Sequence, residues 1–420
     1  MEPVLHSQGS LEALTYSTVA VTLGLVVTRP RLGARFRISP AMAALAGVTV
    51  LALCGSIGLR DLAWAASTMW RPLLGIVSIM VMTGVARRVG VLDGVADFVF
   101  RRAQGSPTKL FAMVFAFGAI TAAVLNNDSA ILLVTPIVVV AARKRMPTLV
   151  VPLAFAVFLS AGIAPLVVSN PMNMVVASYA GIGFNAYALR MAIPTLAGAI
   201  VTFGVARMLF RRDLAEAIPA ERESVRELGR VLTASQKVVL GALAVVVLAY
   251  PVVSFFGGPV WVVAAVGAFL LVAIAARAGH RPLTIVREEM HLDVLVFLVA
   301  VLVLSVGLKN VGVVDRLAHA YAGASPMKVG VLSAAGSAIL NNHPMANLNM
   351  LALSGQSTTS VLAALIGGDL GPRIFPMGSL AGLLWLEMLR REGIAIPVRR
   401  FVLIGSLATI PTLAVALALL

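Results

Sequence analysis

Two short polar runs interrupt long apolar stretches of the chain, and their side chains could bind a solute. The runs are Asn126-Asn127-Asp128 and Asn341-Asn342-His343. Carboxamides, carboxylates and imidazoles are costly in apolar surroundings unless they meet partners, water or a ligand. We therefore expect the four asparagines to bind a small polar substrate. The structural alternative is that Asn127 and Asn342 cap broken helices, and the two roles can coexist.

Two further interruptions contain proline, glycine and small polar residues. They are Ser169-Asn170-Pro171-Met172-Asn173 and Gly367-Gly368-Asp369-Leu370-Gly371-Pro372, the latter continuing to Pro376-Met377-Gly378-Ser379. Pro165 and Pro171 must open the first helix and free backbone carbonyls. Free carbonyls beside amides and hydroxyls form a hydrogen-bonding pocket, or a cation site. The expected substrate-binding set therefore also includes Ser169, Asn170, Asn173, Asn347, Gly378 and Ser379.

Three ionisable residues within these interruptions are candidates for proton coupling. Asp128 is the leading one, because burial favours the neutral carboxyl and allows it to load and release protons near working pH. Its alternative role is an N-cap for the helix that begins at Ser129. Asp369 is the second candidate, with a turn residue as its alternative. His343 occupies the position that matches Asp128 and titrates near neutrality, unless it is only a satisfied hydrogen-bond donor.

The composition identifies the surroundings of these residues. The chain has 420 residues, of which 60% are hydrophobic and 12% are charged. A soluble domain carries about a quarter charged residues, so a soluble enzyme, a disordered scaffold and a secreted disulfide domain are excluded. Cys54 is the only cysteine, and neither a P-loop nor an HExxH motif is present. We therefore expect no cofactor, no bound metal, no enzyme activity and no ATP hydrolysis by the chain itself.

Apolar runs predict an all-α polytopic membrane protein with about ten spans. We place the spans near 13–28, 41–59, 68–86, 148–180, 187–209, 237–256, 259–277, 292–308, 358–389 and 401–420. Segments 109–143 and 328–353 each contain one Asn-Asn pair, and each half is short for a full crossing. These two segments are expected to be re-entrant hairpins, because irregular backbone at membrane depth must be buried in protein or line a cavity.

The formal charge of +15 is distributed along the chain in a way that predicts orientation. Arginine and lysine gather at the segment ends that would share one face of the membrane. The positive-inside rule makes this face cytoplasmic, so both termini are expected outside the inner membrane. Because aromatic residues make up only 6% and the basic residues are not clustered on one face, we expect no nucleic-acid partner.

An internal repeat organises these elements. Val89-Gly90-Val91-Leu92-Asp93, Ser106-Pro107 and the first Asn-Asn pair recur in the same order as Val311-Gly312-Val313-Val314-Asp315, Ser325-Pro326 and the second pair. In each half, one of the two breaks follows the Asn-Asn pair. With five crossings in each half, the second half enters the membrane inverted. We therefore expect repeats at 1–210 and 237–420, a cytoplasmic linker at 211–236 and the inverted-repeat architecture of secondary transporters.

The motifs resemble those of the arsenite/antimonite efflux permeases of the ArsB type, within the ion-transporter superfamily. The resemblance covers roughly residues 70–400. It is carried by Leu125-Asn126-Asn127-Asp128, Ser169-Asn170-Pro171-Met172-Asn173, Leu340-Asn341-Asn342-His343-Pro344 and the segment from Gly368 to Trp385 that contains Gly378-Ser379-Leu380-Ala381 and Leu383-Leu384-Trp385. At His343 the chain departs from the family pattern, in which an apolar residue is expected.

The resemblance implies export of trivalent arsenic or antimony in exchange for protons by alternating access. It also implies a scaffold part, a transport part that carries the hairpins and broken helices, and in some members a soluble arsenite-stimulated ATPase docked from the cytoplasm. Neutral arsenite is a small trihydroxide. A thiolate site for it would need two or three cysteines, which leaves amides and hydroxyls as the available ligands.

Other functions remain open at this point. Within the same superfamily, the alternatives are a sodium/proton antiporter, in which the carboxylates and free carbonyls bind Na⁺, or a transporter of another small anion. A channel-like pore for neutral solutes or a membrane-embedded enzyme would belong to a different class.

Overall fold

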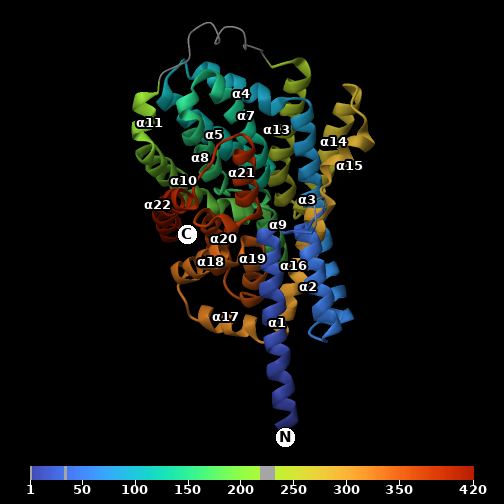
Figure 1. Ribbon diagram of the computed structural model, residues 1–420. Helices are drawn as coiled ribbons and strands as arrows, with labels where there is room; N and C mark the ends of the chain where they lie inside the picture. The colour runs from blue at the N-terminus through green and yellow to red at the C-terminus, as the bar shows by residue number, and fades with distance from the viewer. Residues whose placement is uncertain (1, 33–35, 218–231) are drawn as a thin grey trace.

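The computed structural model describes residues 2–32, 36–217 and 232–420, and these are almost wholly helical (Figure 1). Two strands, β1 (Arg31–Leu32) and β2 (Phe36–Arg37), pair antiparallel between the first two helices. Most of the expected linker at 211–236 lies outside the described residues, so the domain boundaries stay a prediction. The described parts of that segment belong to α11 (Arg211–Glu216) and to the start of α13 (Ala234–Phe255).

The described helices fall in two runs along the chain. The first run contains α1 (Glu2–Thr28), α2 (Pro40–Leu53), α3 (Leu59–Arg88), α4 (Val91–Arg102), α5 (Pro107–Leu125), α6 (Asn127–Ser129), the π-helical turn η1 (Ala130–Val134), α7 (Thr135–Arg145), η2 (Pro147–Leu149), α8 (Val150–Ala161), η3 (Val167–Ser169), α9 (Pro171–Tyr179), α10 (Phe184–Leu209) and α11. The second run contains α13, α14 (Val260–Arg277), α15 (Pro282–Glu289), α16 (Leu292–Asn310), α17 (Val313–Tyr321), α18 (Pro326–Leu340), α19 (Asn342–Ala352), α20 (Thr358–Leu370), η4 (Gly371–Arg373), η5 (Pro376–Gly378), α21 (Leu380–Arg391) and α22 (Val398–Ala418).

The described helices agree with the expected number of membrane spans. Eight of them are long and apolar enough to cross a membrane. One of the eight, α5, is a limb of a hairpin. Adding the shorter α2 and the two broken helices, α8–α9 and α20–α21, to the remaining seven gives the ten spans expected from the sequence. The amphipathic helix α15 was not among the expected elements.

Both Asn-Asn segments are re-entrant hairpins, as expected. The end of the first hairpin returns to the helix that precedes it, because Arg145 of α7 forms a 3.0 Å ion pair with Asp97 of α4. The second hairpin returns in the same way, since the Tyr321 hydroxyl of α17 donates a 2.6 Å hydrogen bond to the carboxamide oxygen of Asn349. Helices α4 and α17 lie at opposite ends of the molecule (Figure 1), so the hairpins enter from opposite sides.

The inverted repeat extends to individual backbone angles. Asn126 and Asn341, which begin the second limbs of the two hairpins, have φ values of 82° and 85°. Gly90 and Gly312, which precede α4 and α17, have φ values of 77° and 80°. The two broken helices restart at extended N-caps, Asn170 and Ser379. These matches confirm the repeat of interruptions predicted from the sequence.

The helices form two bundles that lie side by side in Figure 1. The peripheral bundle consists of α1, α2, α3, α13, α14 and α16, and the hairpin bundle consists of α5–α10 and α18–α22. Aromatic packing joins the two repeats within the hairpin bundle, because Trp385 of α21 stacks on Phe158 of α8 at 4.8 Å between ring centroids. The two bundles meet along α3 and α16, which contact α9 and α19 respectively.

Helices α18 and α20 approach each other so closely that only small residues fit. A methyl group on Gly367 would overlap the backbone carbonyl of Gly330 and the backbone nitrogen of Ala334. A methyl group on Gly371 would overlap the carbonyl of Ala334. Small residues four apart on each helix are a common way for membrane helices to pack. This contact fixes the second hairpin to the start of the second break.

We predict that Gly367→Ala destabilises the protein by about 2 kcal/mol, because backbone atoms cannot move aside as a flexible side chain can. The measurement is thermal unfolding of the purified protein in detergent, followed by tryptophan fluorescence. Gly241→Ala in α13 is the matched control, since a methyl group there would meet no atom within 4 Å. Equal melting temperatures for the two variants would contradict the close contact.

Candidate functional site

The hairpin tips are built around Asn126 and Asn341, whose backbones adopt an unusual conformation. Their φ values of 82° and 85° are combined with ψ values of 160° and 147°, a region that mainly glycine occupies. The side-chain oxygen of Asn126 accepts a 2.9 Å hydrogen bond from the amide of Ser129. The side-chain oxygen of Asn341 accepts one of 3.3 Å from the amide of His343. The two asparagines therefore cap the second limbs while holding costly backbone geometry.

The first hairpin presents a carboxylate at its tip. Asp128 is partly buried, and its backbone amide donates a 2.8 Å hydrogen bond to the side chain of Asn127. Asn126 is the N-cap instead of Asp128, which lies in the first turn after it. The π-helical turn η1 follows directly, and such turns frequently occur at functional sites. The Asp128 carboxylate is therefore free of a capping role.

The second hairpin carries a buried histidine at the matching position. His343 is 5% exposed, and its Nδ1 lies 2.8 Å from the side-chain oxygen of Asn342. Its ring also packs against Phe297 of α16. One turn further along α19, Asn347 is 1% exposed, and neither of its carboxamide atoms has a hydrogen-bond partner among the described residues. A buried carboxamide of this kind calls for water or a ligand.

The two breaks meet at Asp369, which is 7% exposed. Asn170 donates a 2.5 Å hydrogen bond to its Oδ1, and Asn173 donates one of 2.8 Å to its Oδ2. Asn173 also donates to the Tyr187 hydroxyl at 2.9 Å, and that hydroxyl donates to the carbonyl of Ala164 at 3.3 Å. The predicted residues of the first break thus hold the predicted acid of the second. Tyr187 was not predicted.

A buried arginine near Asp369 was also not predicted. Arg373 is 2% exposed and donates a 3.4 Å hydrogen bond to the hydroxyl of Thr202. Its Nε and Nη2 have no hydrogen-bond partner among the described residues. Arg373 and Asp369 interact electrostatically. A single arginine inside an apolar stretch is a recognisable signal of this kind of site in the sequence.

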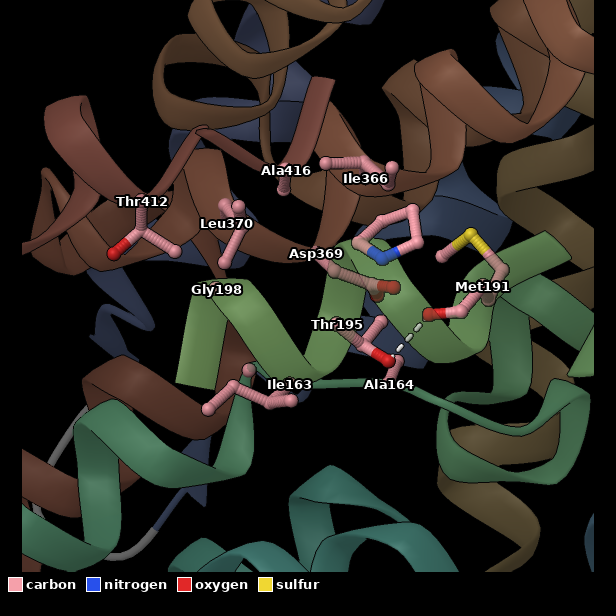
Figure 2. Close-up of a pocket in the computed structure, with 12 residues that line it drawn as sticks. Ile163, Ala164, Met191, Thr195, Gly198, Ile366, Asp369, Leu370, Thr412 and Ala416 are labelled. Atoms are coloured by element: carbon pink, nitrogen blue, oxygen red, sulfur yellow. Dashed lines mark hydrogen bonds between the residues drawn. The ribbon is translucent and has the colours of Figure 1, made fainter. Parts of the chain in front are cut away.

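A small cavity borders Asp369 on the side of α10 and α22 (Figure 2). Its volume is about 20 Å³, and its lining includes Gly162, Thr195, Asp369 and Thr412. A space of this size holds about one water molecule. The carboxylate of Asp369 therefore borders a small space in addition to its two amide partners.

The other predicted residues are structural neighbours of these groups. Ser169 donates a 3.3 Å hydrogen bond to the carbonyl of Ala123 in the first hairpin. Asn341 donates one of 3.2 Å to the carbonyl of Met377 in the second break. Ser379 caps α21 by accepting from the amide of Gly382, and Gly378 packs against the backbone of Pro372. Each break is therefore tied to the hairpin of its own repeat.

A large cavity lies between the two bundles and reaches both hairpin tips. It measures about 640 Å³. Three predicted residues line it, namely Asn126, Asp128 and His343. Pro171 also lines it. Its neighbour Asn170 belongs to the Asp369 cluster, by which we mean Asp369 with Asn170, Asn173 and Tyr187. The remaining predicted residues do not line this cavity, although the Asp369 cluster begins directly behind its wall.

Charged residues line the part of the cavity near the α15 end of the molecule. They are Arg29, Arg37, Arg87, Glu289, His291 and Asp293. Glu289 accepts hydrogen bonds from Arg87 at 2.6 Å and from Arg88 at 3.0 Å, which ties α15 to α3. Arg37 forms a 3.1 Å ion pair with Glu387 of α21 and so links the β1–β2 segment to the hairpin bundle. Burial lowers the pKa of Arg29, and the nearby Arg37 acts in the same direction.

The arrangement suits a small neutral or weakly charged polar solute. At the tips, the amide of Asn126, the carboxylate of Asp128 and the imidazole of His343 line the cavity, and the amides that hold Asp369 lie just behind its wall. Among the described residues, no group of three or more His, Cys, Asp or Glu side chains could hold a metal ion. The geometry therefore provides hydrogen-bond donors and acceptors next to groups that can exchange protons.

Comparison with known proteins places the chain among bacterial transporters. An arsenical pump membrane protein of Yersinia enterocolitica is 30% identical, with 97% of this chain and 98% of that protein covered. An arsenical pump membrane protein of Escherichia coli is 28% identical, with 95% and 96% covered. The crystal structure of the Alcanivorax borkumensis YdaH transporter has a similar fold, with a TM-score of 0.58, 15% identity, and 99% of this chain and 97% of that one covered.

The family comparison agrees with the resemblance seen in the motifs. The family model described as arsenical pump membrane protein (ArsB) matches residues 15–420. The match includes both hairpins, both breaks and all residues of the site described above. The chain belongs to the family of arsenical pump membrane proteins.

Proposed function

We propose that this protein exports neutral arsenite or antimonite across the inner membrane in exchange for protons, by alternating access. The observation that carries the proposal is the cavity of about 640 Å³ between the bundles, which joins a charged mouth to Asn126, Asp128 and His343. Family membership supports arsenic as the substrate.

The cavity chemistry favours the neutral trihydroxide over a thiolate complex. Arsenite and antimonite carry hydroxyl groups that both donate and accept hydrogen bonds, and carboxamides offer the same two functions. Cys54, the only cysteine, is exposed in the loop between α2 and α3. In this proposal, the solute binds at the tips through Asn126, which lines the cavity, and through Asn127, Asn341, Asn342 and Asn347, which lie behind the lining in this structure. Ser169, Asn170, Asn173, Gly378 and Ser379 complete the site at the breaks.

Asp128 and Asp369 are the proposed proton carriers, with His343 as a third titratable group. Asp128 lines the cavity and makes no capping contact, so its carboxylate can meet water from the mouth. Asp369 is held by two amides that are themselves proposed substrate ligands. An ionised Asp128 can accept hydrogen bonds from the hydroxyls of the solute, and a proton on it would weaken these bonds, so proton and substrate compete for this carboxylate.

The charge distribution supports an orientation for the molecule. Basic residues gather at the end that carries α4, α11 and α15, and we infer that this end is cytoplasmic. The N-terminus then lies outside with α17, and so, by this proposal, does the C-terminus. The cavity mouth, with Arg29, Arg37 and Arg87, would open to the cytoplasm. A cytoplasmic arsenite-stimulated ATPase, as in some members of the family, would dock at the same end.

The single cysteine allows a direct test of orientation. We predict that a membrane-impermeant maleimide labels Cys54 in intact cells, because the loop of Cys54 lies at the α17 end. The carboxamide of Asn310 donates a 2.9 Å hydrogen bond to the carbonyl of Ser56 in that loop. A Cys54→Ser variant is the control for background labelling. Labelling that occurs only after the membrane is opened would reverse the proposed orientation.

Arsenite uptake into everted membrane vesicles tests the transport reaction and Asp128 together. An imposed proton gradient, acidic inside, should drive uptake by the parent protein. We expect Asp128→Asn to reduce the gradient-driven part to background while arsenite binding is retained, because the carboxamide cannot carry a proton. Asp315→Asn, an exposed position in the first turn of α17, is the control and should behave like the parent.

The same assay separates the competing functions. Uptake that follows a sodium gradient instead of a proton gradient would indicate a sodium-coupled transporter. Downhill flux that ignores both gradients would indicate a channel. Proton-driven uptake by Asp128→Asn at the parental rate would remove Asp128 from the mechanism.

Substitutions of Asn126 separate its substrate role from its capping role. Glycine at position 126 removes the cost of the positive φ, about 1–3 kcal/mol, and weakens the cap by only a few tenths of that unit. We therefore expect Asn126→Gly to melt at the same temperature as the parent or higher, yet to transport arsenite several-fold more slowly. Asn126→Ala, which keeps the strain and loses the cap, should melt lower. Parental transport by the glycine variant would restrict Asn126 to capping.

A further inference from the structure

Arg373 has hydrogen-bonding capacity that the proposed mechanism does not use. The side chain is 2% exposed, and among the described residues only its Nη1 has a hydrogen-bond partner, Thr202 at 3.4 Å. The unpaired Nε and Nη2 form one edge of the guanidinium. This edge matches the two oxygens of a carboxylate, and such bidentate pairs are among the strongest hydrogen-bonded contacts in proteins. A buried arginine that leaves this edge empty calls for an explanation.

Gly162 makes room for this edge. A methyl group at position 162 would collide with Nε, Nη2 and Cζ of Arg373, so the guanidinium lies directly against the glycine. Gly162 and Asp369 both line the cavity of about 20 Å³ drawn in Figure 2. Arg373 itself does not line this cavity, but its unpaired edge lies against Gly162, which does. Asp369 is also the negative group that acts electrostatically on Arg373.

At present the carboxylate of Asp369 is occupied elsewhere. Asn170 and Asn173 each donate one hydrogen bond to it, at 2.5 and 2.8 Å. These amide hydrogens are the groups that a hydroxylated solute would need at the break. As long as they hold Asp369, they are not available to the solute.

We propose that Asp369 exchanges partners during transport, moving from the amides of Asn170 and Asn173 to the Nε–Nη2 edge of Arg373 when substrate binds. The inference rests on the proposed function and adds a positioning residue to it. Either arrangement gives the carboxylate two hydrogen bonds, so the two states can be close in free energy, as a switch requires. Arg373 thereby makes the site available without touching the substrate.

The exchange is tested with radiolabelled arsenite binding to the purified full-length protein in detergent. Without Arg373 the carboxylate has no second partner and keeps the two amides. We expect Arg373→Gln to raise the Kd for arsenite about tenfold or more, the scale of a hydrogen bond to a charged group. Asn at position 369 carries no charge for Arg373 to attract, so Asp369→Asn/Arg373→Gln should bind as Asp369→Asn alone does. A merely structural arginine would instead give effects that multiply.

Arg145 is the matched control, since it is also a buried arginine but its Nη2 is already paired with Asp97. Arg145→Gln should keep the parental Kd. If Arg373→Gln does not give a monodisperse protein, Arg373→Lys replaces it in both backgrounds and should show a smaller rise with the same non-additivity. A parental Kd in the Arg373 variant, or multiplying effects, overturns the exchange. Absence of arsenite binding by the parent protein contradicts the proposed function instead.

Discussion

A polar group within a bilayer has no water to replace a lost partner, and this constraint governs each interruption of the helices described here. At the hairpin tips, Asn126 and Asn341 supply side-chain oxygens to the amides that begin the second limbs. At the breaks, Asn170 and Ser379 do the same for α9 and α21. The irregular backbone is therefore satisfied by side chains from the same short motifs. Of the polar side chains that do not cap a helix, some line a cavity, as Asp128 does, and others pair with one another, as Asn173 and Asp369 do.

The same constraint explains why the two repeats meet where they do. A carboxylate as buried as Asp369 requires donors, and they come from the other repeat, through Asn170 and Asn173. This contact joins the two breaks within the hairpin bundle, while aromatic packing of Trp385 on Phe158 joins the other halves of the same two broken helices, α21 and α8. The backbones of the repeats correspond, but their chemistry does not. Asp128 in one hairpin corresponds to His343 in the other, so the two tips offer different charges to the same cavity.

Much of the fold was predictable from the sequence because membrane helices are read from apolar length, and polar interruptions are rare within them. The hairpins expected at 109–143 and 328–353 agree with the limbs from Pro107 to Arg145 and from Pro326 to Ala352. The pairing of Asn170 with Asp369 was not predictable, because it joins residues 199 positions apart through the packing of the two repeats within the hairpin bundle. Tyr187 enters the site for the same reason, from a helix whose sequence shows no interruption. Arg373 did leave a signal, as a charge beside the second break, and it gains meaning only from the empty edge of its guanidinium.

The close approach of α18 and α20 has a mechanical consequence. Gly330, Ala334, Gly367 and Gly371 bring two backbones into contact, and Asn341 is hydrogen-bonded to Met377 beyond them. The second hairpin is therefore held against the second break by backbone contact and a hydrogen bond, and it cannot move away from the break without losing both. The first hairpin contains a π-helical turn after Asp128, a kind of turn that frequently occurs at functional sites, and the described part of the second hairpin has none. Both hairpins are tied to their own breaks, the first through Ser169 and Ala123, so the two tips differ mainly in the winding of the backbone that follows them.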